Sequence, residues 1–248
     1  MSTGKKIYFA SDFHLGLGSL EATTAREARV ISWLDSIKHD TEELFLVGDL
    51  FDVWFEYKRV IPKGYVRFLA KIAEFTQAGI PVHIFTGNHD MWMFDYLEKE
   101  LGVKIYREPI TREFNGKIFF IGHGDGLGPG DRGYKFIKSI FRSKFCQWLY
   151  ARFHPNFGIW LATYFSQKGV GKKERENAYM GDDKEYLVLF CNEYVKNHKV
   201  DYFIFGHRHL PLEKQIQNSL YVNLGDWIKF NSYAVFDGEK LELKYWQK

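Results

Sequence analysis

The 248-residue chain contains little cysteine and little proline, and each shortage excludes a class of structure. Cys146 and Cys191 are its only cysteines and cannot form a disulfide framework, which indicates a reducing, cytoplasmic setting. Six prolines, without a low-complexity tract, exclude long linkers. No run approaches the roughly 18 apolar residues of a membrane-spanning helix. The apolar run at 7–10 soon meets Asp12, so we expect no signal peptide.

Acidic residues are nearly absent from the segment 132–175. This segment has ten basic residues and one acidic residue, a charge of +9, whereas the rest of the chain carries −6. Aromatic side chains recur through it, and Ile137, Phe141, Phe145 and Trp148 fall on one helical face. Such a helix is typical of a membrane surface, a partner groove or an anionic-lipid site. The alternative is a helical insertion whose aromatic residues pack onto the body of the protein.

Strand-like and helix-like segments alternate in the first half of the chain. Strands are expected at 5–11, 43–47, 81–86 and 117–122, and helices at 62–78 and 91–101. A further helix runs through Val30 and Ile37, with Thr24 and Glu27 as its capping box. Near the C-terminus, a helix at 182–198 precedes strands at 201–206, 212–217, 219–224, 232–236 and 240–246. The pattern predicts one α/β domain over 1–248, with a second, more antiparallel sheet.

Five short motifs rich in oxygen and nitrogen ligands follow predicted strands. They are Asp12-x-His14, Gly48-Asp49-x-x-Asp52, Gly87-Asn88-His89-Asp90, Gly122-His123-Gly124-Asp125 and Gly206-His207-Arg208-His209. Loops at strand ends gather at one edge of an α/β sheet, so these side chains are expected to build one site. Carboxylate, amide and imidazole groups without thiolate suit Mn²⁺, Fe or Mg²⁺, with Zn²⁺ also possible. The motifs therefore predict a metal centre.

In the order of these motifs, the sequence resembles the calcineurin-like metallophosphoesterase superfamily from Asp12 to His209. The resemblance implies a four-layer αββα sandwich with two divalent metal ions, most simply Mn²⁺. It implies that one metal is held by Asp12, His14, Asp49 and His209. It implies that the other is held by Asn88, His123 and His207 together with a bridging Asp49. Two such ions clamp a phosphoryl group and activate a water that attacks phosphorus in line.

His89 is the candidate catalytic residue outside the ligand set. It follows the ligand Asn88, so we expect it to act on the phosphoryl oxygens or the leaving group, oriented by Asp90. The alternative is that His89 does not contact the substrate and only forms hydrogen bonds to the metal ligands. Asp52 and Asp125 are expected to be hydrogen-bond partners of the ligands rather than ligands themselves.

Within that superfamily, three segments resemble the UDP-2,3-diacylglucosamine pyrophosphatases of lipid A synthesis. The segments are HGDGLGPGDRGY at 123–134, GHRHLP at 206–211 and VNLGDW at 222–227. The resemblance implies hydrolysis to UMP and 2,3-diacylglucosamine 1-phosphate at the cytoplasmic face of the inner membrane. It implies a helical lid at about 131–180 that receives the acyl chains and meets the anionic membrane. It also implies substrate-binding roles for Asp131, Tyr134, Ser166 and Lys173.

The chain departs from that family at His89, where better-known members carry arginine. Arginine offers pyrophosphate a bidentate fork that histidine lacks. The chain is thus a branch that uses histidine on the same substrate, or a phosphodiesterase for another nucleotide, nucleic-acid or lipid ester. A nuclease would also use two metals, basic residues and stacking aromatic residues, but the helical apolar spacing favours a lipid substrate without nucleic acid. A non-catalytic scaffold is expected to lose ligands, and here none is missing. No obligate protein partner is predicted.

Overall fold

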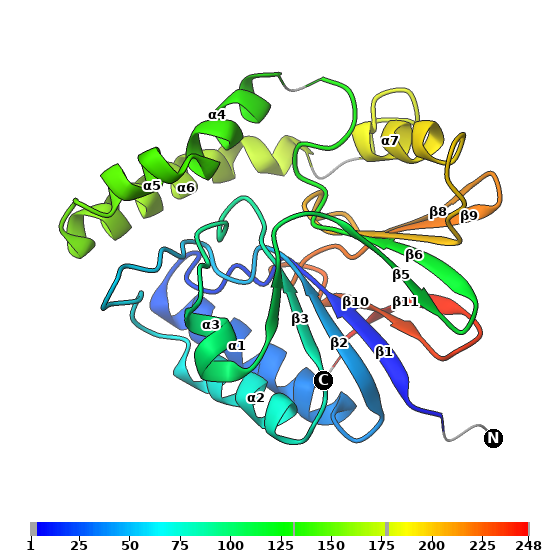
Figure 1. Ribbon diagram of the computed structural model, residues 1–248, viewed down its shortest axis with the longest axis horizontal. Helices are drawn as coiled ribbons and strands as arrows, with labels where there is room; N and C mark the ends of the chain where they lie inside the picture. Colours follow the sequence, from blue (N-terminus) through cyan, green and yellow to red (C-terminus); the bar gives the residue numbers. More distant parts are fainter. Residues whose placement is uncertain (1–3, 131, 177–178, 248) are drawn as a thin grey trace.

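The computed structural model describes residues 4–130, 132–176 and 179–247, with the backbone alone for 168–176. One sheet contains β1 (Lys6–Ala10), β2 (Thr41–Val47), β3 (Val82–Phe85), β4 (Lys104–Tyr106), β10 (Ser232–Phe236) and β11 (Leu241–Tyr245). The other contains β5 (Ile110–Phe114), β6 (Lys117–Ile121), β7 (Tyr202–Phe205), β8 (Leu212–Ile216) and β9 (Ser219–Asn223). The strand orders are β11-β10-β1-β2-β3-β4 and β5-β6-β7-β9-β8 (Figure 1).

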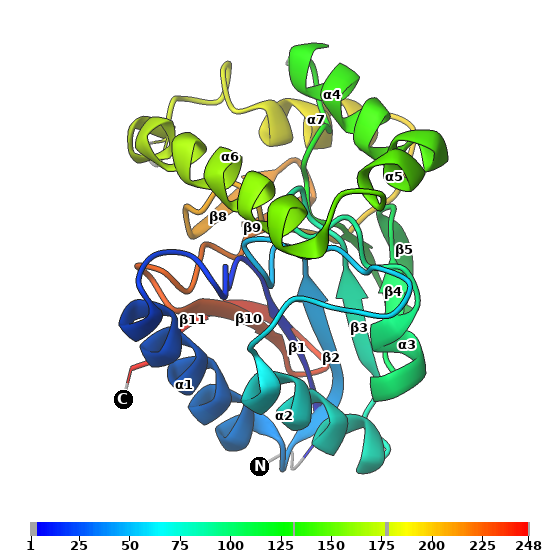
Figure 2. The same cartoon turned by 90° about the vertical axis from the view of Figure 1, so that its left-hand side faces the viewer.

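Three helices cover the outer face of the first sheet: α1 (Leu20–Ile37), α2 (Val66–Gln77) and α3 (Tyr96–Leu101) (Figures 1 and 2). Trp33 of α1 and Ile72 of α2 are fully buried against Leu46 of β2. On the second sheet, α7 (Tyr186–Tyr194) packs Cys191 against Phe203. Each helix thus buries one apolar stripe, as an amphipathic surface helix does.

The inner faces of the two sheets share an aromatic core. Phe9 and Phe45 of the first sheet are buried with Phe119 and Ile204 of the second. The Phe9 and Phe119 rings stack at a centroid distance of 6.0 Å. Because both sheet faces are covered, the strands read as nearly continuous apolar runs. The predicted four-layer αββα sandwich is confirmed.

A helical arm stands outside the four layers. It consists of α4 (Arg132–Arg142), α5 (Lys144–Tyr150) and α6 (Pro155–Glu176) and lies over the carboxyl ends of the strands (Figures 1 and 2). None of the residues of α4 and α5 is buried. Trp92 of the body contacts Phe141 and Tyr150 of the arm.

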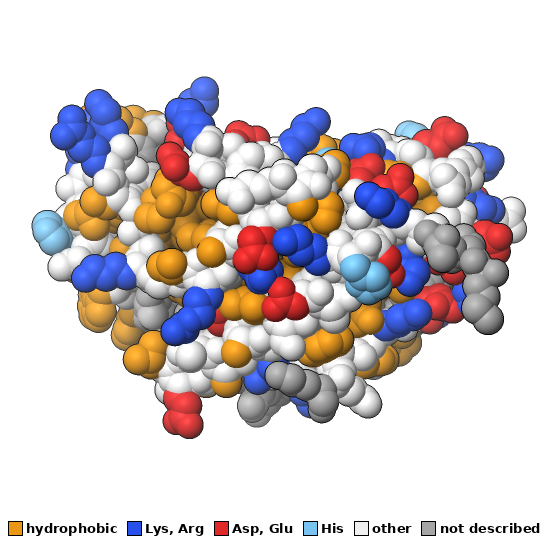
Figure 3. Space-filling model, turned by 90° about the horizontal axis from the view of Figure 1, so that it is seen from below, with side chains coloured by type: hydrophobic (Ala, Val, Ile, Leu, Met, Phe, Trp, Pro, Cys, Tyr) orange, Lys and Arg blue, Asp and Glu red, His pale blue; other side chains and the backbone are white. Residues whose placement is uncertain are grey.

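On the face shown in Figure 3, which looks from below, acidic and basic side chains are interspersed. Within the described residues, every helix is too short or too polar to cross a bilayer.

The start of α1 differs from the prediction. The N-cap is Ser19, whose side chain accepts a hydrogen bond from the Ala22 amide. Thr24 lies inside the helix and bonds back to the Leu20 carbonyl. Glu27 instead accepts from the amide of Phe68, at the start of α2. The capping box was wrong because Glu27 has a partner far away in sequence.

The membership of the predicted second sheet was wrong, although two of its four strand pairs, β5 with β6 and β8 with β9, are antiparallel. β10 pairs with β1 and carries β11, so both of these C-terminal strands extend the first sheet. In the second sheet, β7 runs parallel to both β6 and β9. The short strands β4 and β5 were not predicted, and helices α2, α3 and α7 are shorter than expected. Alternation within a strand identifies its buried face but does not identify the neighbour it pairs with.

Candidate metal centre

The carboxyl ends of both sheets meet beneath the helical arm, and the predicted ligands lie there. Asp12 and His14 follow β1, Asp49 follows β2 and Asn88 follows β3. His123 follows β6, and the loop after β7 carries His207 and His209. The motifs are therefore brought together from both sheets, as the strand-end argument predicted.

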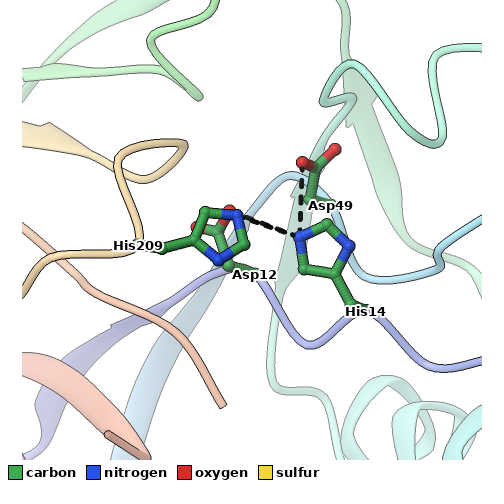
Figure 4. Close-up of side chains that lie close together, drawn as sticks. All are labelled: Asp12, His14, Asp49 and His209. Atoms are coloured by element: carbon green, nitrogen blue, oxygen red, sulfur yellow. Dashed lines mark hydrogen bonds and ion pairs between the residues drawn. The ribbon is translucent and has the colours of Figure 1, made fainter. Parts of the chain in front are cut away.

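Four of these side chains form one buried cluster (Figure 4). One donor atom from each of Asp12, His14, Asp49 and His209 lies within 4.8 Å of the others. The two Nε2 atoms of His14 and His209 are 3.2 Å apart. His14 Nε2 is 3.6 Å from Asp49 Oδ2, and His209 Nε2 is 3.4 Å from Asp12 Oδ1. Two imidazoles and two carboxylates thus face one another, as expected around one divalent cation.

A second cluster shares Asp49 with the first. Asp49 combines with His123 and His207, and its Oδ2 is 3.3 Å from His123 Nε2. Asn88 lies in the loop after β3, and its buried Oδ1 accepts no hydrogen bond from the described residues. Asp49 therefore belongs to both candidate ligand clusters.

Buried polar atoms in these clusters test whether the residues fit metal ions. Asp49 Oδ2 and His123 Nε2 are buried, and no described residue gives either a hydrogen bond. Leaving such an atom unpaired costs about 1–3 kcal/mol. Carboxylate oxygen, amide oxygen and neutral imidazole all suit hard or borderline cations. The donor set fits two divalent ions, which would satisfy these atoms.

The backbone at the clusters is strained. Among the residues that the structure describes, nine non-glycine residues have positive φ, and five of these are Asp12, His14, Asp49, His207 and His209. Each costs of order 1–2 kcal/mol and persists only where the surroundings impose it. The strain gathers at the predicted ligands, as is common at functional sites.

Glycines next to the ligands allow close packing. A Cβ atom at Gly87 would overlap the Asp49 carboxylate, and one at Gly206 would overlap that of Asp12. Neither glycine has a positive φ. Close approach to a neighbouring ligand, rather than a sharp turn, therefore explains both glycines.

Hydrogen bonds behind the clusters aim the imidazoles. His123 Nδ1 bonds to the Val47 carbonyl at 2.8 Å, which turns its Nε2 toward Asp49. His209 Nδ1 is 3.3 Å from Asp226 Oδ2. Asp226 was not predicted, although it lies in the segment 222–227 that carried the resemblance. Partners of this kind fix the orientation and basicity of a ligand.

Burial and neighbouring charges shift the pKa values of three predicted ligands. Burial would raise the pKa of Asp12, but the charge of His209 and the hydrogen bond of His14 lower it to about 2. Burial and the nearby charge of His123 lower the pKa of His207 to about 3. Burial would lower the pKa of His123, but Asp49 raises it to about 10. Asp12 is therefore ionised and His207 neutral at pH 7, whereas His123 must lose a proton to coordinate a metal.

The expected orientation of His89 by Asp90 was wrong. Asp90 is fully buried and accepts hydrogen bonds from the amides of Gly87 and Leu50, which ties the loops after β3 and β2. His89 instead places Nδ1 3.0 Å from the Asp52 carbonyl and 3.4 Å from its carboxylate. Residues 88–90 form a bend after β3, and the Asp90 carboxylate is taken up by the two amides rather than by His89.

The other expected site residues have mixed outcomes. Asp52 Oδ1 lies 3.5 Å from Nδ1 of the predicted ligand His14, and these two residues form a third candidate ligand group with His89. Asp125 accepts a hydrogen bond from Tyr134 and pairs with Lys138 at 2.6 Å. Ser166 reaches Asp52 from α6. Asp131 lies outside the described residues, and of Lys173 only the backbone in α6 is described.

One buried ion pair behind the site was missed. Arg208, between the ligands His207 and His209, donates to both oxygens of Glu185 at 3.0 and 2.8 Å. Glu185 is the N-cap of α7, so the pair attaches the ligand loop to the second sheet's helix. Arg208 was visible only as a basic residue within a motif, with no signal for its partner 23 positions away.

Two cavities of opposite character adjoin the clusters. An apolar cavity of about 490 Å³ opens between the body and the helical arm, with Asn88 and His89 in its wall. A polar cleft, with two parts of about 280 and 330 Å³, has His123 and Asp125 in its wall. The cleft's basic residues are Arg107, Lys135, Lys138, Arg142 and Lys144.

An αββα sandwich with two adjoining carboxylate–imidazole clusters at its strand ends is the architecture of a dinuclear metallohydrolase. The sequence model of the calcineurin-like phosphoesterases matches residues 5–211, and the chain belongs to that family. It is therefore a metal-dependent phosphoesterase with candidate ligand clusters for a dimetal centre.

Curated relatives cover nearly the whole chain. It is 40% identical to the UDP-2,3-diacylglucosamine hydrolase of Porphyromonas gingivalis, over 96% of this chain and 97% of that protein. The hydrolase of the same name from Shewanella halifaxensis is 27% identical, over 95% of each chain. Among solved structures, an archaeal phosphodiesterase matches with a TM-score of 0.49 and 16% identity, over 97% of this chain and 99% of that one.

Proposed function

We propose that the chain hydrolyses the pyrophosphate of UDP-2,3-diacylglucosamine to UMP and 2,3-diacylglucosamine 1-phosphate. The observation that carries this proposal is the pair of cavities, one apolar and one basic, that adjoin the same ligand clusters. Such a pair suits a pyrophosphate with a lipid on one side and a nucleotide on the other. The names of the two relatives support the same substrate.

The apolar cavity would take acyl chains. Its wall includes Ile137, Ile140 and Phe141 of α4, with Leu161 and Phe165 of α6. Burying an acyl chain there is worth about 0.8 kcal/mol per CH₂. Because most of this wall comes from the helical arm, we assign the arm the role of a lid.

The polar cleft would take the nucleotide half. Lys138 lies against Asp125, and Arg142 pairs with Glu108 at the rim of the cleft. Arg107 donates to backbone carbonyls of Met93 and Phe94. These cations can bind the phosphate of the UMP portion by charge-assisted hydrogen bonds.

In this mechanism, Asp12, His14, Asp49 and His209 would hold one ion, and Asn88, His123 and His207 would hold the other with Asp49. Mn²⁺ is our first choice, with Fe, Mg²⁺ or Zn²⁺ as alternatives. Two bound ions supply charge for the phosphoryl oxygens and a water of lowered pKa. Asp52 fixes Nδ1 of His89. We therefore assign His89 Nε2 to the phosphoryl oxygens, where it stabilises charge or donates a proton to the leaving group.

The outer surface of the helical arm would lie on an anionic membrane at the cytoplasmic face of the inner membrane. Phe145, Trp148 and Trp160 are 67%, 53% and 58% exposed. The Arg152 guanidinium lies 4.5 Å from the centre of the Trp148 ring. Aromatic residues alternating with basic ones suit the headgroup region of such a bilayer. This placement would bring the cavity to its lipid substrate.

A comparison of three substrates tests the proposal. With Mn²⁺ present, we expect kcat/KM for UDP-2,3-diacylglucosamine to exceed that for UDP-glucosamine and for bis(p-nitrophenyl) phosphate by at least about a hundredfold. UDP-glucosamine retains the pyrophosphate and lacks both acyl chains. Equal turnover of the two UDP compounds would contradict the lipid assignment. Cleavage of bis(p-nitrophenyl) phosphate alone would contradict the proposed substrate and indicate a different phosphoester.

A further inference from the structure

We propose that Ser166, on helix α6 of the arm, is a positioning residue that orients His89 through Asp52. The inference rests on the hydrolase function proposed above, because it gives Ser166 a task in that reaction. The sequence resemblance implied a different role for Ser166, a direct contact with the substrate.

The contacts form a short chain from the arm to the histidine. Ser166 Oγ lies 2.8 and 2.9 Å from the two carboxylate oxygens of Asp52, across 114 positions of sequence. Asp52 Oδ1 is 3.4 Å from His89 Nδ1, and Ser166 Oγ is itself 3.4 Å from that atom. The Asp52 side chain is 3% exposed, so little water competes for these contacts.

Asp52 stands between two imidazoles. Its Oδ1 is 3.5 Å from Nδ1 of His14, a predicted ligand, and 3.4 Å from Nδ1 of His89. The His14 and His89 rings meet edge to face at 4.7 Å. A carboxylate that can turn toward either ring needs a further contact to fix its plane. The hydroxyl of Ser166, which lies against both carboxylate oxygens, supplies that contact.

The position of Ser166 links this orientation to the arm. The arm also donates hydrogen bonds to Asp125, Gly128, Arg107 and Glu108 around the polar cleft. Trp92 of the body donates to the Phe141 carbonyl of the arm. Among the described residues, Ser166 is the arm residue that bonds to Asp52. When α6 lies on the body, His89 has its carboxylate partner fixed. Hydrolysis is thereby favoured when the arm is in place.

Two roles for Ser166 can be separated by experiment. A residue that contacts the glucosamine affects the lipid substrate alone and does not depend on His89. A positioning residue affects every substrate that His89 acts on, including bis(p-nitrophenyl) phosphate, and its effect requires His89. Thr163, one turn earlier on α6, bonds to the Ile159 carbonyl within its own helix and gives a matched control.

The experiment compares Ser166→Ala, Ser166→Thr and Thr163→Ala, each with and without His89→Ala. We expect Ser166→Ala to lower kcat about tenfold on both substrates with little change in KM. Ser166→Thr should restore most of the loss, Thr163→Ala should lose nothing, and the loss should vanish in the His89→Ala background. A rise in KM confined to the lipid substrate, or a loss that persists without His89, would overturn the proposal.

A second measurement does not depend on activity. In protein labelled with ¹⁵N-histidine, the His89 resonances are assigned through their absence in the His89→Ala variant. Ser166→Ala should shift the His89 Nδ1 resonance, whereas Thr163→Ala should not. An unchanged resonance would overturn the inference. If UDP-2,3-diacylglucosamine is not cleaved, the proposed substrate fails, yet the small phosphodiester and the spectrum still decide the role of Ser166.

Discussion

His89 is held from behind by Asp52 and stands beside the predicted ligand Asn88. Its amide also donates to Asp49 Oδ1 at 2.9 Å, so its backbone is tied to the carboxylate shared by both clusters. The position of the imidazole is therefore fixed by the same loops that position the ligands. His89 also belongs to a candidate ligand group with His14 and Asp52, so its role in the reaction has to be separated from metal binding by experiment.

The first prediction concerns this separation. His89→Ala is expected to lower kcat about a hundredfold or more, because a positioned acid or charge stabiliser contributes that much. Metal content, measured by inductively coupled plasma mass spectrometry, should remain that of the wild type. A variant that loses metal in proportion to activity would instead make His89 a support of the ligands.

At this scale the sequence predicted the chemical types better than the contacts. Asp12, His14, Asp49, His123 and His209 could be chosen because motif and strand end coincide. Asp226 and Glu185 could not, because each supports a residue 17 or 23 positions away through a contact that only the folded chain creates.

The helical arm carries two different apolar surfaces. Phe141 lines the cavity beside His89, whereas Phe145 and Trp148 are exposed and stack on each other at 6.1 Å. Helical spacing had placed Phe141 and Phe145 on one face with a single role. The break between α4 and α5 at Ser143 separates them, and periodicity does not report such a break.

The second prediction tests the cavity surface. Phe141→Ser should lower kcat/KM for UDP-2,3-diacylglucosamine about tenfold, since it removes apolar area that the acyl chains would contact. Steady-state kinetics with bis(p-nitrophenyl) phosphate should be unchanged. Equal losses on both substrates would mean that Phe141 supports the fold of the site rather than the lipid.

The third prediction tests the outer surface. Trp148→Ser combined with Phe145→Ser should reduce binding to vesicles of phosphatidylglycerol about tenfold or more in flotation, because aromatic side chains anchor at the headgroups. Turnover of detergent-dispersed substrate should persist. Unchanged flotation would contradict membrane docking through this surface.

Between the sheets, Glu43 of β2 forms a polar contact that depends on pH. His83 of β3 donates to Glu43 at 2.8 Å and accepts from Tyr106 of β4, while Arg112 of β5 lies 3.3 Å from Glu43. The His83 hydrogen bond lowers the pKa of Glu43 from 4.5, and the charge of Arg112 adds to this against the effect of burial. A carboxyl with a lowered folded-state pKa stabilises the fold above its unfolded value, and that stabilisation is lost as pH falls.

The fourth prediction follows from this loss of stability as the pH falls. Glu43→Gln should lower the free energy of unfolding by about 1 kcal/mol at pH 7. The difference from the wild type should shrink as the pH falls below 4.5. Urea denaturation of both proteins at a series of pH values measures it. A difference that does not change with pH would contradict an ionised Glu43 as its source.

Over the whole molecule, the four-layer sandwich could be predicted because the motif order carried a resemblance to a known family. The segments that form strands could be predicted for most of both sheets, since buried strands have continuous apolar runs. The pairing of β10 with β1 was not recoverable, because β10 could bury its apolar face equally well in either sheet. Long-range pairing is decided by packing that no local segment contains.

The asymmetry of the whole molecule supports its proposed use. Two candidate metal-ligand clusters at the joined strand ends, an apolar cavity under the arm and a basic cleft beside it match the three parts of a lipid–pyrophosphate–nucleotide. Asp49 lies in both clusters, so every activity of the site is expected to depend on it.

The most direct measurement incubates the Mn²⁺-loaded protein with UDP-2,3-diacylglucosamine and identifies the products by mass. We expect UMP and 2,3-diacylglucosamine 1-phosphate to form in equal amounts. Asp49→Ala should form them at least about a thousandfold more slowly and bind less metal, because the change removes a ligand of both ions. Different products, or full turnover by Asp49→Ala with its metal depleted, would contradict the account.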